Sequence, residues 1–258
     1  MKVVIFAGGL GTRLMEETEA RPKPMVEIGG KPIIWHIMKI YAQYGFNDFI
    51  ICLGYRGYMI KEYFFNYYLH NSDVEIDLSN NNLRILESNS ENIKVTLVDT
   101  GLNTKTAGRL KRVQKFIGDE PFMLTYGDGV SDININKLLE FHKSHDRIAT
   151  ITSIQPAGRF GLLATDENGN VTNFIEKPKG DNAWINGGFF VLEPQIFKYL
   201  PENSDDMMWE EGPLYKLGTE QQLSAYKYKG FWKCMDHLRD KLELEEMISK
   251  NKAPWITW

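Results

Sequence analysis

The sequence predicts an α/β protein whose central sheet is mixed but mostly parallel and flanked by helices, with a small additional β-rich portion. Short runs of β-branched and aromatic residues stop at glycines, which is typical of strands buried on both faces of a sheet. Segments with helical spacing alternate with these runs in the first half of the chain. Beyond residue 145 the pattern shifts toward strands, which favours a mixed sheet there.

The first strand–helix–strand unit occupies residues 2–53. Residues 3–6 are predicted to form a buried strand that stops at a glycine pair. A helix of about three turns begins at Pro32 and ends at Gly45, and residues 49–53 form the second strand. The crossover between parallel strands should be right-handed.

The remaining elements follow along one domain, because no linker or repeat separates the chain into units. Strands are expected at 74–78, 83–87, 95–98, 122–125, 148–153, 171–175, 185–191 and 223–228, and helices at 57–69, 106–116, 134–145, 207–217 and 237–249.

Composition excludes several classes of protein. The 258 residues include 30 basic and 34 acidic side chains, so the formal net charge is −4 and no global positive field attracts nucleic acid or an anionic membrane. Two cysteines, Cys52 and Cys234, make neither a disulfide scaffold nor a thiolate metal cage, which favours a reducing cytoplasm. The first apolar run is too short for a signal peptide, and no stretch approaches the roughly 20 apolar residues of a membrane span.

A glycine-rich turn, Ala7-Gly8-Gly9-Leu10-Gly11-Thr12-Arg13-Leu14, follows the first strand. Backbone N–H groups without Cβ obstruction can approach phosphate oxygens there. The dinucleotide pattern would need glycine where Leu14 stands, and a Walker A loop would need glycine where Arg13 stands. A nicotinamide-dependent oxidoreductase is therefore disfavoured, and a loop containing a fixed cation is predicted. The alternative is a simple tight turn.

Two further residues carry charge at places where a ligand is expected. In Arg21-Pro22-Lys23-Pro24-Met25, two prolines are expected to hold Lys23 in extended backbone, although a lone lysine is commonly a solvated charge. Asp128, between two glycines, follows the strand at 122–125, and ligands of open α/β sheets bind at the carboxyl ends of strands. Its alternative is an ordinary turn aspartate.

These motifs resemble those of the sugar-phosphate nucleotidyltransferases, also called nucleoside diphosphate sugar pyrophosphorylases. The family's opening signature, a strand followed by A-G-G-x-G-T-R-L and then P-K-P-M, is matched by Ala7–Leu14 and Pro22–Met25. Other segments are similar to the glucose-1-phosphate cytidylyltransferase branch, namely Val26–Pro32, Thr125–Gly129, Phe160–Gly161, Glu176–Gly180, Asn186–Phe190 and Ala253–Trp255. The resemblance spans essentially the whole chain.

The resemblance implies a Rossmann-like sheet, a nucleotide-binding half at 1–130 and a sugar-phosphate-binding half at 131–258 that includes the small β-rich portion. It implies Mg²⁺ and the reaction of CTP with α-D-glucose 1-phosphate to give CDP-glucose and pyrophosphate. It suggests deoxysugar synthesis for a bacterial cell-surface polysaccharide such as O antigen. The alternatives are an enzyme that uses UTP or dTTP, and a nucleotide-sugar sensor without catalysis.

The resemblance also implies roles for individual residues. Arg13, Lys23 and Asp128 would be catalytic, and Asp128 and Asp236 would bind the metal. The nucleotide would contact Ala7, Gly8, Gly9, Leu10, Gly11, Thr12, Arg13, Lys23, Thr104, Gly108, Arg109 and Gly127. The sugar phosphate would contact Glu176, Lys177, Asn186 and Gly187. On spacing alone, Asp236 could instead be the N-cap of the helix that begins near His237.

Two groups of side chains leave alternatives open. Lys105, Arg109 and Arg112 belong to the predicted base-recognition segment, and the alternative is a basic helix face in water. Tyr63, Phe64, Phe65, Tyr67 and Tyr68 are predicted to lie in the core or at a subunit contact, and a homo-oligomer is expected. The histidines show no metal-ligand spacing and receive no role.

Overall fold

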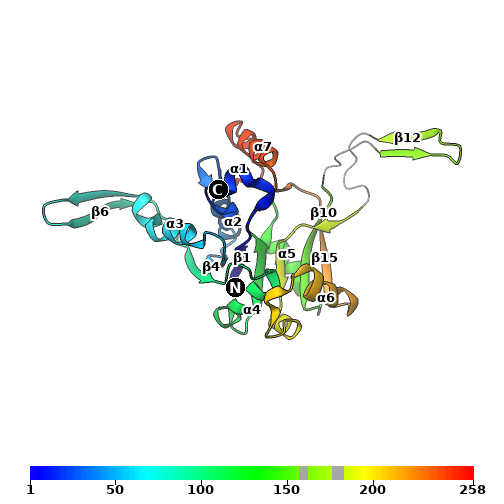
Figure 1. The fold of residues 1–258 in the computed structure, drawn as a ribbon, viewed down its shortest axis with the longest axis horizontal. Coiled ribbons are helices and arrows are strands. Elements are labelled where there is room, and N and C mark those ends of the chain that lie inside the picture. Colours follow the sequence, from blue (N-terminus) through cyan, green and yellow to red (C-terminus); the bar gives the residue numbers. More distant parts are fainter. Residues whose placement is uncertain (157–161, 176–182) are drawn as a thin grey trace.

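A central sheet organises the chain (Figure 1), and the computed structural model describes residues 1–156, 162–175 and 183–258. Strands β1 (Val3–Ala7), β4 (Asp48–Leu53), β7 (Lys94–Asp99) and β8 (Phe122–Tyr126) are parallel and lie in the order β8-β1-β4-β7. The predicted parallel part of the sheet is therefore confirmed. Both β1 and β4 are almost completely buried, as their continuous apolar runs indicate.

The second half of the chain continues the same sheet and makes it mixed. β14 (Phe190–Leu192) is antiparallel to both β8 and β10 (Ala149–Ile154), and β15 (Leu223–Tyr228) is parallel to β10. The single strand predicted at 185–191 is wrong, because it forms two strands, β13 (Ile185–Asn186) and β14. Gly188 and Phe189 have φ values of 73° and 47°, a left-handed conformation that interrupts a strand.

Helices cover both faces of the sheet (Figure 1), which is the Rossmann-like arrangement expected. Val3 and Ile5 of β1 pack into one core cluster with α2 (Ile33–Ala42). Val4 and Phe6 point to the opposite face and pack into a second cluster with α4 (Thr106–Ile117). Further helices are α3 (Gly57–His70), α5 (Ile135–Lys143), α6 (Tyr215–Thr219) and α7 (Leu238–Ser249).

The predicted helix at 207–217 is wrong in its first part. Residues Glu210–Leu214 form a π-helix, and α6 follows it. Pro213 has no N–H, so the Trp209 carbonyl accepts a hydrogen bond from the Leu214 N–H at 2.9 Å, five residues later. Proline chemistry thus changes the helix type at this point.

Several short elements were not predicted. They are the turns of 3₁₀-helix at Thr12–Leu14, Lys23–Met25, Pro194–Tyr199 and Ser204–Asp206, the short helix α1 (Met15–Thr18), and the strands β2 (Glu27–Ile28), β3 (Lys31–Pro32), β9 (Gly129–Ser131), β11 (Leu162–Thr165) and β16 (Trp232–Cys234). β11 pairs with β12 (Val171–Ile175), and β2 pairs with β3. Within the described ranges, no helix is long and apolar enough to cross a membrane.

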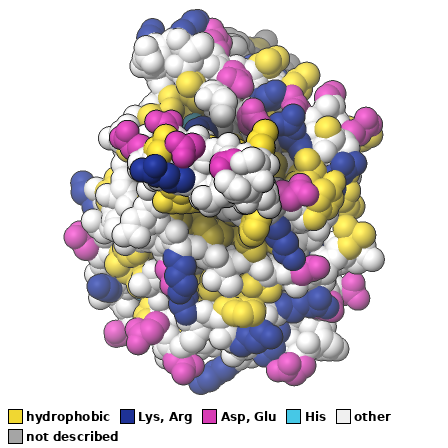
Figure 2. Space-filling model, turned by 90° about the vertical axis from the view of Figure 1, so that its left-hand side faces the viewer, with side chains coloured by type: hydrophobic (Ala, Val, Ile, Leu, Met, Phe, Trp, Pro, Cys, Tyr) yellow, Lys and Arg dark blue, Asp and Glu magenta, His cyan; other side chains and the backbone are white. Residues whose placement is uncertain are grey.

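A hairpin of β5 (Ser72–Asp77) and β6 (Asn82–Ser88), as predicted, projects from the body beyond α3 (Figure 1). It carries exposed apolar side chains, of which Leu78 at the tip is 89% exposed. Figure 2 shows hydrophobic side chains in a hollow on the side of the molecule from which this hairpin projects.

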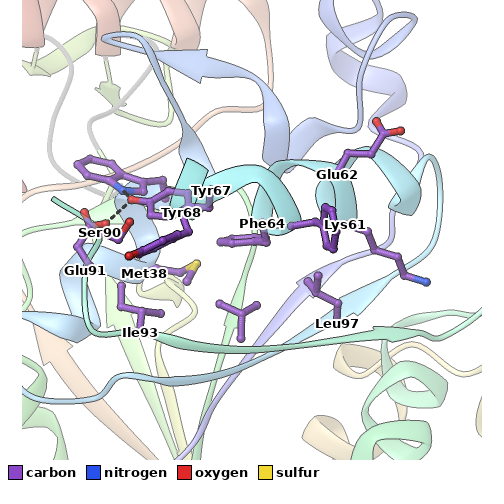
Figure 3. A pocket seen from close by; sticks show the side chains of 13 residues that line it. Met38, Lys61, Glu62, Phe64, Tyr67, Tyr68, Ser90, Glu91, Ile93 and Leu97 are labelled. Atoms are coloured by element: carbon purple, nitrogen blue, oxygen red, sulfur yellow. Dashed lines mark hydrogen bonds between the residues drawn. The ribbon is translucent and has the colours of Figure 1, made fainter. Parts of the chain in front are cut away.

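An apolar groove with a volume of about 770 Å³ lies between α3 and β7 (Figure 3). Phe64, Tyr67 and Tyr68 line it from the helix, and Ile93 and Leu97 line it from the opposite side. This surface is called the α3 groove below. The predicted aromatic side chains of α3 are thus only partly in the core.

Candidate active site

The loop after β1 forms one wall of a pocket of about 540 Å³ at the carboxyl ends of β1 and β8. Gly11, with φ of 67°, turns the chain, and its carbonyl accepts hydrogen bonds from the Leu14 N–H at 3.0 Å and the Thr18 hydroxyl at 3.1 Å. Leu14 is fully buried and anchors the loop. Leu14, which stands where the dinucleotide pattern would have its third glycine, therefore packs in the core. This hollow is called the strand-end pocket.

The side chain of Arg109 holds the loop in place. Its Nη2 donates to the Gly8 carbonyl at 2.9 Å, and its Nη1 donates to the carbonyls of Leu53 and Gly101, both at 2.9 Å. Arg109 is only 4% exposed, so the alternative that it faces water is wrong. Its guanidinium ties the loops that follow β1 and β7 to the last residue of β4.

Lys23 lies at the mouth of the strand-end pocket and contacts two carboxylates. Its Nζ donates to Asp128 Oδ2 and to Asp236 Oδ1, each at 2.7 Å. The prediction of extended backbone at Lys23 is wrong, because the carbonyl of Pro22 accepts from the Met25 N–H at 2.8 Å and closes a 3₁₀ turn. The prolines lack donors, but their carbonyls still close turns.

A small antiparallel sheet brings Asp236 close to Asp128. β16 pairs with β9, with Cys234 opposite Gly129, and the Met235 N–H donates to the Asp128 carbonyl at 2.8 Å. Arg13 completes the group, since its Nη1 donates to Asp236 Oδ2 at 2.8 Å. Lys23, Arg13, Asp128 and Asp236 are called the charge cluster below.

The alternative role of Asp236 as a helix N-cap is wrong. His237 is the N-cap of α7, and Asp240 accepts hydrogen bonds from the N–H groups of His237 and Asp236. The carboxylate of Asp236 instead accepts from Lys23 and Arg13. Its side chain therefore belongs to the charge cluster.

The charge cluster shifts two pKa values in opposite directions. Burial alone would lower the pKa of Lys23, but the charges and hydrogen bonds of Asp128 and Asp236 outweigh it and raise that pKa. Burial alone would raise the pKa of Asp236, but Lys23 and Arg13 outweigh it and lower that pKa. Both groups are therefore charged at neutral pH.

Most of the predicted nucleotide-binding residues line the strand-end pocket. They are Ala7, Gly8, Gly9, Leu10, Gly11, Thr12, Arg13, Lys23, Thr104, Arg109 and Gly127, together with Asp128. Gly108 does not line it. A Cβ at Gly108 would lie 2.7 Å from the Asp205 Cα, so this glycine allows α4 to pack closely against the turn at 204–206.

The predicted sugar-phosphate residues divide into two groups. Glu176 and Lys177 lie outside the described residues. Asn186 reaches the strand-end pocket indirectly, since its Nδ2 donates to the Tyr126 hydroxyl at 3.0 Å. Gly187 is buried beside β10, and its N–H donates to the Thr152 carbonyl at 2.9 Å.

Sequence reasoning missed several residues that line the pocket. Tyr126, Thr106, Met208 and Glu210 belong to this set, with Leu102 and Asn103. Tyr126 has a signal in the sequence, because it is the last residue of the strand that leads to Asp128. Glu210 has none, since it comes from a segment 84 residues away from Tyr126.

Comparison with known proteins agrees with this geometry. A family model for nucleotidyl transferases matches residues 2–246. The chain is 54% identical to the glucose-1-phosphate cytidylyltransferase of Salmonella typhi and 44% identical to a probable glucose-1-phosphate cytidylyltransferase of Bacillus subtilis, and each match covers 100% of both chains.

Among solved structures, HddC from Yersinia pseudotuberculosis superposes with a TM-score of 0.68 at 26% identity, over 96% of this chain and 99% of that one. An apo UDP-glucose pyrophosphorylase gives the same TM-score at 18% identity, over 98% of this chain and 99% of that one, a likeness of fold. The chain therefore belongs to the nucleotidyl transferase family, in the branch of the glucose-1-phosphate cytidylyltransferases.

Proposed function

We propose that this chain transfers the cytidylyl group of CTP to α-D-glucose 1-phosphate, giving CDP-glucose and pyrophosphate. The observation that carries the proposal is the convergence of Lys23, Asp128 and Asp236 through one Nζ, at the mouth of a pocket formed by a glycine-rich loop. Phosphate chemistry needs such a site, because positioning and charge neutralisation provide most of the catalysis. The named activity of the 54% identical relative supports the choice of substrates.

The attacking oxygen needs no general base. It belongs to a phosphate monoester whose second pKa is about 6, so it is mostly dianionic at neutral pH. Repulsion between anions is the barrier, and Arg13 and Lys23 would reduce it by stabilising negative charge at the α-phosphate as pyrophosphate leaves. In-line attack then requires only that both substrates are held in the correct orientation.

Asp128 and Asp236 fit a divalent cation, and we propose Mg²⁺. Carboxylate oxygens are the ligands that Mg²⁺ prefers, and it is usually held by one or two carboxylates plus substrate phosphates. The described part of the chain contains no group of three or more histidine, cysteine or acidic ligands, which agrees with a metal that shares its coordination with phosphate. When bound, the cation neutralises charge on the phosphate oxygens.

Each half of the chain has its own proposed substrate. The nucleotide would contact the glycine-rich loop, Gly127, Thr104 just before α4 and Arg109 on α4, with Gly108 holding α4 against the turn at 204–206. The sugar phosphate would contact Asn186 and Gly187, with Glu176 and Lys177. Residues 1–130 would thus bind the nucleotide and residues 131–258 the sugar phosphate within one domain.

The test is release of pyrophosphate from a nucleotide panel. CTP, UTP and dTTP are each supplied with glucose 1-phosphate and Mg²⁺, and inorganic phosphate is measured after coupling to pyrophosphatase. We expect the highest rate with CTP. No release from any nucleotide by folded protein that binds CTP would favour a sensor without catalysis, and a faster rate with UTP or dTTP would refute the base assignment.

We further propose that the chain works as a homo-oligomer. The α3 groove is apolar, Phe65 on α3 is 88% exposed, and the β5–β6 hairpin beside it carries Leu78 in water. One chain thus offers both an apolar hollow and a projecting apolar arm, and large exposed apolar patches commonly mark contacts between proteins. Light scattering coupled to size exclusion should give a mass of at least twice the 29.8 kDa of one chain, and a mass of one chain would refute the oligomer.

A cytoplasmic location and a role in polysaccharide synthesis complete the proposal. Cys52 and Cys234 are both free thiols, which suits a reducing compartment. A nucleotide-activated glucose is a suitable donor for building deoxysugars of a cell-surface polysaccharide such as O antigen. Loss of that polysaccharide on deletion of the coding sequence would test this role.

A further inference from the structure

The carboxylate of Glu210 connects two sides of the strand-end pocket. Its Oε1 accepts a hydrogen bond from the Tyr126 hydroxyl at 2.5 Å, and its Oε2 accepts one from the Thr106 hydroxyl at 3.2 Å. Tyr126 is the last residue of β8, two residues before Asp128, and Thr106 is the first residue of α4. One side chain thus links the strand that leads to the charge cluster with the helix on the proposed nucleotide side.

The Tyr126 branch continues to the proposed sugar-phosphate side. The Tyr126 hydroxyl accepts from Asn186 Nδ2 at 3.0 Å, and Asn186 Oδ1 accepts from the Gly188 N–H at 2.8 Å. The phenol is the donor of its bond to Glu210, because a carboxylate oxygen can only accept. Each group in this chain of hydrogen bonds has one orientation, and Glu210 is its acceptor end.

The Thr106 branch fixes the start of α4. The Thr106 hydroxyl accepts from the Trp209 N–H at 2.8 Å, which leaves its own proton for Glu210. The Lys105 N–H donates to the Asp205 carbonyl at 2.7 Å, and the Ala107 N–H donates to the Met207 carbonyl at 3.0 Å. The segment at 205–209 is therefore hydrogen-bonded to Lys105, Thr106 and Ala107 at the beginning of α4.

The backbone that carries Glu210 is held rigidly. Trp209, directly before it, is fully buried and packs edge-on against Phe190, with ring centroids 5.8 Å apart. Glu210 also begins the π-helix that Pro213 imposes. Among the described residues no cation pairs with Glu210, and its side chain accepts from the hydroxyls of Tyr126 and Thr106. A side chain on such a fixed element can hold its partners to a narrow geometry.

We propose that Glu210 is a positioning residue that sets the sugar-phosphate side, through Tyr126 and Asn186, and the nucleotide side, through Thr106, in one shared geometry. The inference rests on the proposed function, which assigns those two sides to the two substrates. Without the carboxylate, the phenol and the threonine hydroxyl lose their common acceptor. Both substrates should then lose orientation together.

The experiment compares Glu210→Ala, Glu210→Gln, Tyr126→Phe and the double variant Tyr126→Phe/Glu210→Ala. Glu211→Ala is the matched control, because Glu211 is the exposed neighbour. Binding of CTP and of glucose 1-phosphate is measured separately by calorimetry, and kcat by pyrophosphate release. Thermal melting reports whether each variant is folded, and the Gln variant carries the test if the Ala variant does not fold.

We expect Glu210→Ala to weaken both affinities by roughly tenfold and to lower kcat by roughly tenfold to a hundredfold, because small misplacements of reacting groups cost that much. Glu210→Gln keeps one acceptor oxygen for Tyr126 and should recover part of the glucose 1-phosphate affinity. Glu211→Ala should match the unaltered protein. The double variant should be little worse than Glu210→Ala, because linked residues share one effect.

Loss of only one affinity, or of neither, would overturn the shared geometry. Additive effects of Tyr126→Phe and Glu210→Ala would also overturn it, because they would mean that the two residues act independently. Failure of the proposed function has a different signature. If the unaltered protein binds both ligands and releases no pyrophosphate, that function is wrong, and the calorimetry still decides the role of Glu210.

Discussion

The strand-end pocket and the α3 groove are two hollows of one molecule that differ in their linings. The groove is the larger, at about 770 Å³ against about 540 Å³, and its lining is mostly aromatic and aliphatic, with Lys61, Glu62, Ser90 and Glu91 at its edges. The pocket combines glycine backbone, charged groups and hydroxyls with apolar side chains such as Leu10 and Met208. The proposed reaction is assigned to the smaller hollow, because charged groups converge there at the strand ends, where ligands of open α/β sheets bind.

The two hollows also differ in what holds them open. The walls of the groove are α2, α3, β7 and the segment at 90–93 that leads into β7. The walls of the pocket combine loops with the ends of β1, β8 and α4, and the buried guanidinium of Arg109 ties the loops after β1 and β7 to Leu53, the last residue of β4. Substitutions in the pocket should change chemistry and loop geometry, whereas substitutions in the groove should change association.

The largest effect is expected in the charge cluster. Lys23→Ala and Asp128→Asn should each lower kcat by roughly a hundredfold to a thousandfold, since preorganised groups that act on developing charge contribute about that much. Asp119→Asn, at an exposed position, is the control. Pyrophosphate release at saturating substrate measures kcat, and circular dichroism checks folding. Near-normal turnover in both variants would refute the mechanism.

A smaller effect is expected at Arg109, whose guanidinium holds the loop after β1 in place. Arg109→Lys should raise KM for CTP by about tenfold and lower the free energy of unfolding by about 1.5–3 kcal/mol, because one ammonium cannot reproduce the planar fork of donors. Arg84→Lys, at an exposed position of β6, is the control. Urea unfolding and steady-state kinetics measure the two quantities. An unchanged unfolding midpoint for Arg109→Lys would contradict this role of Arg109.

In the groove, the effect should fall on assembly and leave catalysis intact. Phe65→Glu places a charge on the exposed apolar face of α3 and should shift the mass measured by light scattering toward 29.8 kDa. The value of kcat should change little, because no residue in the described ranges lines both hollows. Phe65→Leu keeps an apolar side chain and serves as the control. An unchanged mass for Phe65→Glu would remove this surface from the proposed interface.

The smallest effect concerns acid stability. The pKa of Asp236 is lowered below its ordinary value of 3.8, because Lys23 and Arg13 outweigh the effect of burial. A lowered pKa in the folded state gives a stabilising contribution that is present at neutral pH and is lost as the pH falls below about 3.8. The difference in free energy of unfolding between the unaltered protein and Asp236→Asn should therefore shrink from pH 7 to pH 3.

Lys23 should have the opposite dependence. Its pKa is raised above the ordinary 10.5, because the two carboxylates outweigh burial. Its contribution to stability is thus complete below that value and is lost as the pH rises through the higher pKa of the folded state. Urea unfolding across both ranges measures these contributions. A difference between the unaltered protein and Asp236→Asn that stays constant with pH would contradict the acid prediction.

Local patterns in the sequence predicted the frame of the pocket. The run at 3–6 and the glycines after it determine a buried strand and a turn, and Asp128 follows from its position after another such run. The prediction failed at 185–191, where the Gly187-Gly188 pair marks a break that the single predicted strand ignores, and left-handed backbone at Gly188 and Phe189 divides the segment into β13 and β14.

Long-range pairings could not be predicted from periodicity. Asp236 was placed near Asp128 by family resemblance alone, because strands of three residues, β9 and β16, leave no periodic signal. Glu210 had neither a motif nor a pattern. Its role depends on hydrogen bonds to residues 84 and 104 positions away, which only the folded chain brings together. The binding roles of the site residues stay predictions.

The two cations and two carboxylates of the charge cluster balance one another within the polypeptide itself. A newly synthesised chain can therefore fold before it binds a divalent metal ion or a nucleotide, because each carboxylate of the charge cluster already has a cationic partner. Chelating agents should then abolish the activity of this protein without unfolding it. Refolding from urea would need no added salt of a divalent metal.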